Sequence, residues 1–471
     1  MPESPKQALY GILSFNPSDG ATLYLITYNT TELLLDGIPD TQTVKGWTQF
    51  VPGSNVHIEI IHGINHLGER ITLENCWQIK SPMNFRNIFV REAQFDVENI
   101  YVGQHFNTPA QIQFDSLIVE LTNLTNWLGL GRFHNDLDTD NKLGTIKLEY
   151  AEPELASSIQ NMNIRISSSV KFEPTLTSFS ESHLYHDSAF ILTPKSPLSF
   201  KQYMDVYVYN LQNFLTLATY RPAIPTSIIG TIRTSSSDKN ATSSAKRIRV
   251  FSKFANVENK PIDRRFMLFR FEEVEEIITE CLEKWFDKSK EYKHVFDLYF
   301  GLFYVPPIYI NLEFLILAQT IETYHRDFHE GKYVSKEDYQ KYYEAMYNAL
   351  PDDINSRLKN RLKGFLQYGY EFSLRTRLKH LLNEVLSEYK DEMNNLIGRF
   401  KDFVNKVTET RNYYTHYTDS KYAVTDPGQL YYLAQKLKII LQICFLIELG
   451  IPSDKIREMI TSSSAYKRLV K

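Results

Sequence analysis

The pattern of apolar residues changes near residue 262, and this change separates two parts of the chain that differ in fold class. Before it, short runs of β-branched and aromatic residues lie between Gly, Pro, Asn and Asp, as at 21–28 and 56–61, which is typical of strands. After it, apolar residues recur at helical spacing, and the joining segments are short. The sequence therefore predicts an α+β multidomain protein, with a β-rich N-terminal domain over 1–262 and an all-α helical bundle over 263–471.

Individual elements can be placed within both parts. In the N-terminal part, strands are predicted at 10–15 and 22–26, joined by a turn at 16–20, and then at 87–90, 93–101, 112–121, 145–150, 164–172, 226–234 and 247–254. One amphipathic helix is predicted at 199–219, and a polar loop at 235–244. In the C-terminal part, helices are predicted at 271–286, 312–329, from 335 onward, 354–366, 374–389, 394–410, 428–449 and 452–460.

The composition limits the classes of function. The 471 residues carry 52 basic and 56 acidic side chains, for a net charge of −4, so any contact with RNA requires a local basic patch. The three cysteines, Cys76, Cys281 and Cys444, are far apart and show no CxxC spacing, so we expect neither a disulfide framework nor a zinc site. The N-terminus lacks the pattern of a signal peptide, and the apolar stretches at 300–318 and 439–449 are interpreted as core helices. These features predict a cytoplasmic protein that does not span a membrane.

Two groups of side chains in the N-terminal part have the composition of metal ligands without the spacing. The acidic segment 135–141 lacks the ligand spacing and the closing Glu of a calcium loop, so it is interpreted as a solvated loop. His57, His62 and His66 lie near two glutamates. Their alternating and loop-like spacing favours ordinary histidines of a sheet over a metal site, and we expect no metal.

A local excess of positive charge lies in the helical part. Between 357 and 379 seven cations are accompanied by one acidic residue, Glu371. The cations are Arg357, Lys359, Arg361, Lys363, Arg375, Arg377 and Lys379. Such a patch is typical of a surface that follows a phosphate backbone, and the alternative interpretation is a solvated helix face. We expect the first four cations to bind RNA.

The stretch Thr410-Arg-Asn-Tyr-Tyr-Thr-His-Tyr417 places an Arg, an Asn and a His within six residues. Arg411 carries a permanent charge that holds phosphate through two hydrogen bonds and stabilises charge in a transition state. His416 titrates near neutral pH, so it is suited to move the proton of a ribose 2′-hydroxyl or of a leaving oxygen. This combination predicts phosphoryl transfer on RNA without a metal ion. The alternative interpretation is a solvated arginine and a histidine at a helix end.

A second stretch fits the same loose spacing. Arg375-Thr-Arg-Leu-Lys-His380 also places Arg before His, but it lacks the Asn and lies in the basic helical segment. Asn directly after Arg is the rarer feature on average composition, so the motif at Arg411 is the preferred candidate. We expect the residues of the second stretch to be dispensable for catalysis.

The preferred motif resembles that of HEPN ribonucleases, in which Arg and a polar residue, often Asn, precede a His. The N-terminal part is also similar to a known family. Gly11-Ile-Leu, Glu32-Leu-Leu-Leu-Asp-Gly37, Ile61-His-Gly63 and the segment 68–76 resemble the N-terminal domain of ApeA-like bacterial anti-phage proteins. Those proteins join this domain to a C-terminal HEPN domain. The resemblance covers nearly the whole chain and implies a HEPN core over about 308–450.

The resemblance implies a role for each residue of the motif. Arg411 contacts the scissile phosphate and His416 transfers protons, while Asn412 orients the His or contacts phosphate. HEPN proteins often place an acidic residue on an earlier helix of the bundle. Glu322 is the candidate here, and a buried residue between packed helices is the alternative. Cleavage through the 2′-hydroxyl leaves a 2′,3′-cyclic phosphate and a 5′-hydroxyl, and the reaction needs no cofactor.

The resemblance also implies partners. RNA is the expected substrate, with transfer RNA as the guess that the family suggests, and a phage component is the expected trigger. Tyr413, Tyr414 and Tyr417 are expected to stack on bases or simply to pack. The β-rich domain is expected to act as a sensor or regulator of the HEPN domain in an abortive-infection response.

Geometry favours a homodimer, and a higher homo-oligomer is the alternative. Arg411 and His416 are five residues apart, so on a regular helix they point about 140° apart. They converge only if the helix ends or bends between them, or if a second copy faces the first. Two other functions stay open, a HEPN module that binds without cleaving and a nucleotidyl transferase. The intact motif disfavours the first, and the lack of a P-loop or glycine-rich phosphate loop disfavours the second.

Overall fold

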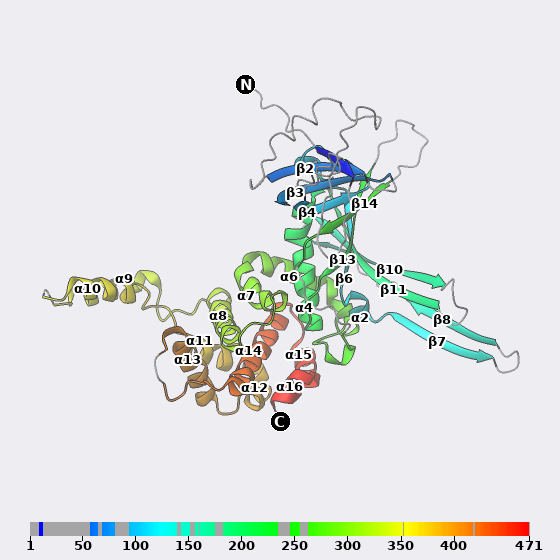
Figure 1. Cartoon of the computed structure of the whole chain (residues 1–471). Coiled ribbons are helices and arrows are strands. Elements are labelled where there is room, and N and C mark those ends of the chain that lie inside the picture. Colours follow the sequence, from blue (N-terminus) through cyan, green and yellow to red (C-terminus); the bar gives the residue numbers. More distant parts are fainter. Residues whose placement is uncertain are drawn as a thin grey trace, which may run out of the picture. The chain divides into compact units, whose positions relative to one another are not determined.

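The computed structural model describes residues 9–12, 57–64, 68–80, 94–138, 143–150, 156–159, 161–174, 182–233, 245–254, 262–351, 353–417 and 420–470. The chain forms two compact units (Figure 1). The first unit contains residues 1–212 and 223–261, and the second contains 213–222 and 262–471. The second unit therefore includes a short segment that lies before residue 262 in the sequence. The predicted fold class is confirmed, since the first unit is built on a sheet and the second is mainly helical.

The first unit is organised around one mixed sheet. Ten described strands pair in the order β1-β2-β3-β4-β14-β13-β6-β11-β10-β9. Only the pair of β1 and β2 is parallel among them. The strands are β1 Leu9–Ile12, β2 His57–Ile64, β3 Arg70–Lys80, β4 Gln94–Val102, β6 Ser116–Leu121, β9 Ala156–Ile159, β10 Met162–Pro174, β11 Ser182–Pro194, β13 Pro225–Arg233 and β14 Ala245–Ser252. Two further described pairs join β5 Gln113–Phe114 to β12 Leu198–Ser199, and β7 Gly131–Asp138 to β8 Leu143–Tyr150.

Two features of this unit differ from the sequence predictions. The acidic segment predicted as a loop is in part a strand, because Asn135 to Asp138 pair with Leu143 to Ile146 on β8. Backbone pairing with a neighbouring strand outweighs the local preference of Asn and Asp for turns. The strand β11 was not predicted, although it pairs with β10 over thirteen residues. The predicted turn at 16–20, the strands at 22–26 and 87–90, the loop at 235–244 and His66 lie outside the described residues.

The helix predicted at 199–219 is present as a continuous helical segment. It comprises α3 Phe200–Gln202, a π-helical stretch Tyr203–Val208 and α4 Tyr209–Thr219. Ser199 caps it, since its hydroxyl accepts from the Gln202 backbone N–H while the Gln202 side chain accepts from the Ser199 backbone N–H. This reciprocal pair explains why the helix begins where the preceding strand ends.

The second unit is a helical bundle. Its helices are α5 Phe271–Val274, α6 Ile278–Glu291, α7 Lys293–Tyr304, α8 Ile310–His329, α9 Lys336–Asn348, α10 Ser356–Gln367, α11 Leu374–His380, α12 Lys390–Ile397, α13 Phe400–His416, α14 Pro427–Glu448, α15 Ser453–Ser462 and α16 Ser464–Leu469. Helix α8 packs against α7, α11, α13 and α14. This position makes α8 the central helix of the bundle.

The core of the bundle combines one long apolar helix with an aromatic cluster. Trp285 on α6 is buried. The centroid of its ring lies 4.7 to 6.1 Å from the ring centroids of Phe214, Phe296, Phe300 and Phe445. Such edge-on contacts add to the free energy that burial of the rings contributes. Phe214 comes from α4, which explains why 213–222 belongs to this unit. Helix α14 is the one described helix that is long and apolar enough to cross a membrane, and most of its apolar stretch is buried in the bundle.

Three predicted helices are divided in the structure. The one predicted at 374–389 continues past α11 as a π-helical stretch at 381–385 and a 3-10 turn at 387–389. The helix predicted at 394–410 is broken at Gly398, which has a φ of +72° and separates α12 from α13. A left-handed residue ends a right-handed helix, and Gly adopts this conformation at little cost. The helix predicted at 271–286 is interrupted by a 3-10 turn at 275–277. Helix α7 was not predicted as a separate element.

Helices α9 and α10 form a hairpin that projects from the bundle, and we call residues 332–371 the arm (Figure 1). Its two ends are joined by backbone hydrogen bonds from Tyr333 to Tyr370 and from Phe372 to Gly331. No residue of α9 or α10 themselves is buried. The arm is therefore fixed to the bundle at its base and exposed along its length.

Candidate active site

Helix α13 carries the Arg-Asn-His motif, and it is held in place by one apolar face. Phe403, Val404 and Val407 are buried against the bundle. The buried Thr410 accepts, through its hydroxyl, the backbone N–H of Val424 at 2.9 Å. This contact ties the segment after α13 to the turn that precedes Arg411. The packing therefore determines the position of the motif up to its first residue.

Glu322 on α8 lies between two guanidinium groups. Arg411 Nη2 is 3.7 Å from Glu322 Oε2, and Arg326 Nη2 donates to Glu322 Oε1 at 3.3 Å. The Glu322 side chain is 14% exposed, whereas that of Arg411 is 34% exposed. Arg411 Nη1 also donates to Asn412 Oδ1 at 3.4 Å. The structure thus brings Glu322, Arg411 and Asn412 together, and it leaves part of the Arg411 guanidinium open to solvent.

His416 lies on the last turn of the same helix, and its side chain is exposed. The helix runs without a break from Phe400 to His416, and it ends at Tyr417, which has a φ of +52°. The helix therefore neither ends nor bends between Arg411 and His416. The two side chains leave it about 140° apart, so they do not converge within one chain.

Three tyrosines surround the end of the motif. The rings of Tyr413 and Tyr414 lie 5.1 Å apart, and those of Tyr413 and Tyr417 lie 5.8 Å apart, both edge to face. Partial burial, followed by the two neighbouring tyrosines, raises the pKa of Tyr414. Tyr417 is 71% exposed, so one ring of this cluster is open to a partner while the other two pack against each other.

In the second Arg-His stretch, residues 375–380, both arginines make contacts within the protein. Arg375 Nη2 donates to Glu409 on α13 at 2.7 Å, and Arg375 Nη1 donates to Asn405 on the same helix. Arg375 therefore joins α11 to the motif helix. Arg377 is fully buried. Both arginines therefore make contacts that hold elements of the bundle together.

Arg377, His325 and His380 form a chain of hydrogen bonds, which we call the histidine relay. Burial, followed by the nearby cations and histidines, lowers the pKa of His325 to about 3, so the ring is neutral at neutral pH. Arg377 Nη1 lies 3.3 Å from His325 Nδ1, and arginine has only donors, so this nitrogen accepts. The other nitrogen, Nε2, then carries the proton and donates to His380 Nδ1 at 3.0 Å. His380 is thus an acceptor within the relay.

A line of alternating charges connects this relay to the motif. Arg377 Nη2 is 3.5 Å from Glu371, and Arg326 Nε is 3.6 Å from the same carboxylate. Arg326 in turn contacts Glu322, which contacts Arg411. Arg326 was not predicted as a site residue, and the sequence did not connect Arg377 and Glu371 to the motif. The spacing of Arg326 four residues after Glu322 was a usable signal, whereas the contacts of Glu371 and Arg377 depend on tertiary structure.

The four predicted RNA-binding cations are on a different element from the motif. Arg357, Lys359, Arg361 and Lys363 all lie on α10 in the arm. The structure does not gather them with the tyrosines at the end of α13. Contact with both regions by one RNA therefore requires a substrate that extends beyond the reacting phosphate.

His57 and His62, the described members of the predicted histidine group, have separate hydrogen-bond partners. His57 pairs with Asn75, and its ring contacts Trp77. His62 is buried and contacts the backbone oxygen of Phe106 at 2.7 Å, and burial lowers its pKa. Among the described residues no group of His, Cys, Asp and Glu has the arrangement of a metal site. Cys76, Cys281 and Cys444 are each buried and unpaired.

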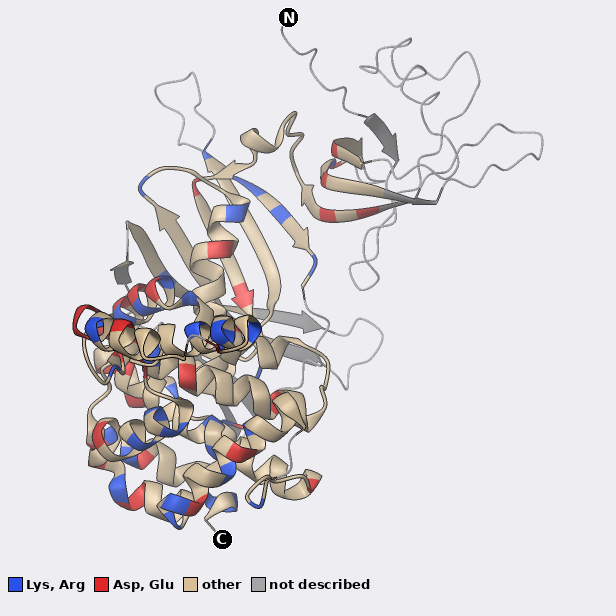
Figure 2. Ribbon diagram, turned by 90° about the vertical axis from the view of Figure 1, so that its left-hand side faces the viewer, with Lys and Arg blue, Asp and Glu red and all other residues tan. Residues whose placement is uncertain are grey.

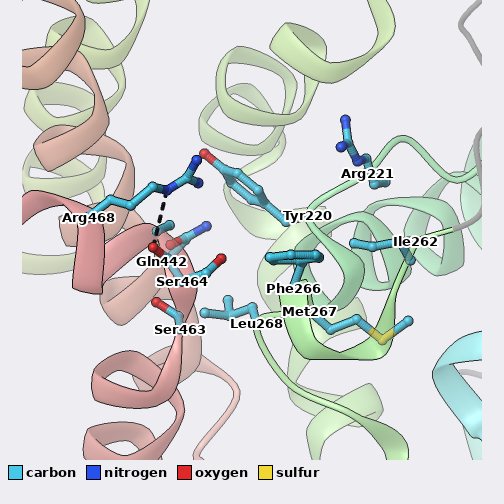
Figure 3. A pocket seen from close by; sticks show the side chains of 11 residues that line it. Tyr220, Arg221, Ile262, Phe266, Met267, Leu268, Gln442, Ser463, Ser464 and Arg468 are labelled. Atoms are coloured by element: carbon cyan, nitrogen blue, oxygen red, sulfur yellow. Dashed lines mark hydrogen bonds between the residues drawn. The ribbon is translucent and has the colours of Figure 1, made fainter.

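A cavity of about 320 Å³ lies in the helical unit away from the motif (Figure 3). Its walls include Tyr220, Phe266, Leu268 and Gln442, and Arg468 stands at its side with Nε donating to the Ser464 backbone oxygen at 3.2 Å. None of the residues of the motif and none of the predicted RNA-binding residues lines it. The cavity is therefore no part of the candidate active site.

The fold and the motif define a class of protein, a HEPN helical domain preceded by a β-rich domain. The family model described as ApeA N-terminal domain 1 matches residues 1–285, and the model described as Apea-like HEPN matches residues 315–455. The chain therefore belongs to the ApeA family, and the predicted resemblance is confirmed. No curated protein and no solved structure matches the chain. Membership in this family supports the interpretation of the chain as an anti-phage HEPN protein.

Proposed function

We propose that this protein is a metal-independent HEPN endoribonuclease that acts in bacterial anti-phage defence by abortive infection. The observation that carries the proposal is the contact of Arg411 with Glu322, next to Asn412 and on the helix that presents His416. HEPN domains are generally ribonucleases, so the family and the geometry support the same reaction. The proposed substrate is RNA, with transfer RNA as the class that the family suggests, and the proposed site of action is the cytoplasm.

The proposed reaction uses the ribose 2′-hydroxyl as the nucleophile. The 2′-oxygen forms a bond to phosphorus, the bond from phosphorus to the 5′-oxygen breaks, and the products are a 2′,3′-cyclic phosphate and a 5′-hydroxyl. Arg411 binds the phosphate and stabilises its developing charge. Glu322 holds Arg411 on one side and leaves the other side exposed. His416 moves the proton of the attacking or the leaving oxygen, and Asn412 orients the catalytic groups.

The active unit in this proposal is a homodimer. Within one chain Arg411 and His416 point about 140° apart on an unbroken helix. A two-fold contact between two α13 helices would place two copies of each residue at one cleft. The dimer therefore supplies what a single motif lacks, a cation and a proton carrier that face the same phosphate.

The β-rich domain is proposed to keep the HEPN domain inactive until a phage component is present. An unrestrained ribonuclease would kill its host, so an intracellular HEPN enzyme needs such control. This assignment rests on the order of the two domains and on the family.

We expect the purified protein to cleave total RNA in the presence of EDTA. The motif supplies its own cation and proton carrier, so removal of divalent ions should leave the rate nearly unchanged. Gel analysis and end-group analysis should show products with 2′,3′-cyclic phosphates. Cleavage that stops in EDTA and returns with Mg²⁺ would rule out the proposed chemistry. Incorporation of labelled nucleotide into RNA or protein, without cleavage, would instead identify a nucleotidyl transferase.

Mixing two inactive proteins should test the shared site. Arg411→Ala and His416→Ala proteins are combined under conditions that exchange subunits, and cleavage is measured before and after mixing. If Arg411 of one chain works with His416 of the other, each mixed dimer has one intact pair and cleavage returns. Activity that stays absent, or an active protein that sediments as a monomer, would show that each site is built within one chain.

A further inference from the structure

The arm has a surface that does not pack against the bundle. Its two helices contain 13 and 12 residues, and none of these residues is buried. Helices in proteins gain most of their stability from packing. The contacts inside the arm are few and local, such as the hydroxyl of Tyr339 that donates to the Leu366 backbone oxygen at 2.6 Å. The outward faces of α9 and α10 therefore remain available to a partner.

Helix α10 combines cations with exposed aromatic rings. Arg357, Arg361 and Phe365 follow one another at intervals of four residues, so they share one face of the helix. The Arg361 guanidinium lies over the Phe365 ring, 5.5 Å from its centroid. Phe365 is 64% exposed, and Tyr368, just past the helix end, is 60% exposed. We call Arg357, Arg361, Phe365 and Tyr368 the arm stripe.

The positive charge of helix α10 indicates what kind of partner the arm stripe can bind. Helix α10 has four cations and no carboxylate, so it complements a polyanion. Two α10 helices facing each other would bring like charges together. Cations beside exposed aromatic rings are the combination by which proteins hold single-stranded nucleic acid, since the cations follow the phosphates and the rings stack on bases. Figure 2 shows the basic residues of the arm, which points toward the viewer in that orientation.

The base of the arm is fixed to the candidate active site. Arg377 donates to the backbone oxygens of Glu330 and Phe372, which lie just before and just after the arm, at 3.2 and 3.0 Å. Glu371 at the end of the arm contacts Arg326, which contacts Glu322. A molecule bound to the arm is therefore bound to an element whose base is connected, through Arg326, to Glu322, the ion-pair partner of Arg411.

We propose that the arm binds a single-stranded segment of the substrate RNA through the arm stripe, apart from the phosphate that reacts. This inference rests on the proposed function for the identity of the substrate. In it, Arg357 and Arg361 contact phosphates, and Phe365 and Tyr368 stack on bases. The arm thereby favours RNAs long enough to reach both α10 and α13.

The test measures binding of a labelled oligouridine of about 16 nucleotides to full-length protein that carries His416→Ala, so that cleavage does not interfere. Arg357→Gln with Arg361→Gln should reduce the slope of log affinity against log salt by about 1.4, because each phosphate contact on a single strand contributes about 0.7. Phe365→Ala should weaken binding at least about fivefold and leave this slope unchanged, because stacking is not a counterion effect. Lys290→Gln with Lys467→Gln removes the same charge from α6 and α16 and serves as the matched control.

The outcomes separate this proposal from the proposed function. Affinity and salt slope that equal those of the control would overturn it, even if the wild-type protein cleaves RNA. Variants that bind RNA normally but change from dimer to monomer in sedimentation would show that the arm is a contact between two copies. If the wild-type protein cleaves no RNA but the arm-stripe variants still bind RNA more weakly than the control, the arm proposal is supported and the nuclease proposal is rejected. Since no arm-stripe residue is buried, circular dichroism should show all variants folded.

Discussion

Replacing Arg411 or His416 with Ala is expected to reduce RNA cleavage by about 10²- to 10⁴-fold, the range that a general acid–base or a transition-state cation contributes. Arg411 contacts Glu322 and Asn412 with a guanidinium that is still one third exposed. His416 is exposed on the last turn of α13. Neither side chain is buried, so removal should affect the reaction far more than folding. The measurement is the initial rate on an RNA that the wild-type protein cleaves, together with thermal unfolding of each variant.

Two control variants test whether the loss of cleavage is specific to Arg411 and His416. Lys401→Ala removes an exposed cation from the first turn of the same helix, and it should leave the rate nearly unchanged. His380→Ala tests the second Arg-His stretch, whose histidine serves as an acceptor for His325. It should keep most of the activity. A loss from His380→Ala as large as that from His416→Ala would transfer the catalytic assignment to the second stretch.

Replacing Arg377 with Met is expected to lower the free energy of unfolding by about 3–5 kcal/mol, the range measured when one partner of a buried charged network is removed. Arg377 is fully buried and donates to Phe372, Glu330 and His325. Methionine fills similar space but offers no donor. The variant therefore leaves two backbone oxygens and one imidazole nitrogen without the partner that replaces water. The arm should also lose its fixed base.

Denaturant unfolding of the full-length protein measures this effect. Arg375→Met is the matched control, because Arg375 lies two residues away on α11 and its ion pair with Glu409 is about one third exposed. Partly exposed pairs contribute about 0–1 kcal/mol, so this variant should unfold near the wild-type midpoint. Equal midpoints for Arg377→Met and Arg375→Met would show that the buried network adds little to stability.

Local sequence patterns were sufficient for the fold class of the two units. The change from strand-like to helical periodicity near residue 262 predicted the two kinds of unit, because each periodicity reflects which side chains face a core. The spacing of Arg411, Asn412 and His416 lies within two turns of one helix, so it was readable without tertiary contacts. The same patterns failed where distant backbone decides the outcome. Asn135 to Asp138 have turn composition, yet they pair in β7, and β11 is defined by its pairing with β10.

The tertiary structure decided which residues lie beside the motif. Glu322 and Arg411 are 89 positions apart, and only the packing of α8 against α13 brings them to 3.7 Å. The two Arg-His stretches look alike in sequence, but the packing of α11 directs Arg375 to Glu409 and buries Arg377. The basic segment is one run in sequence, but the fold divides it. Four cations lie on the exposed arm, and on α11 Arg375 pairs with Glu409, Arg377 is buried and Lys379 is exposed. Spacing along a chain determines which side chains share a helix face, whereas burial and ion pairing depend on which other elements pack against that face.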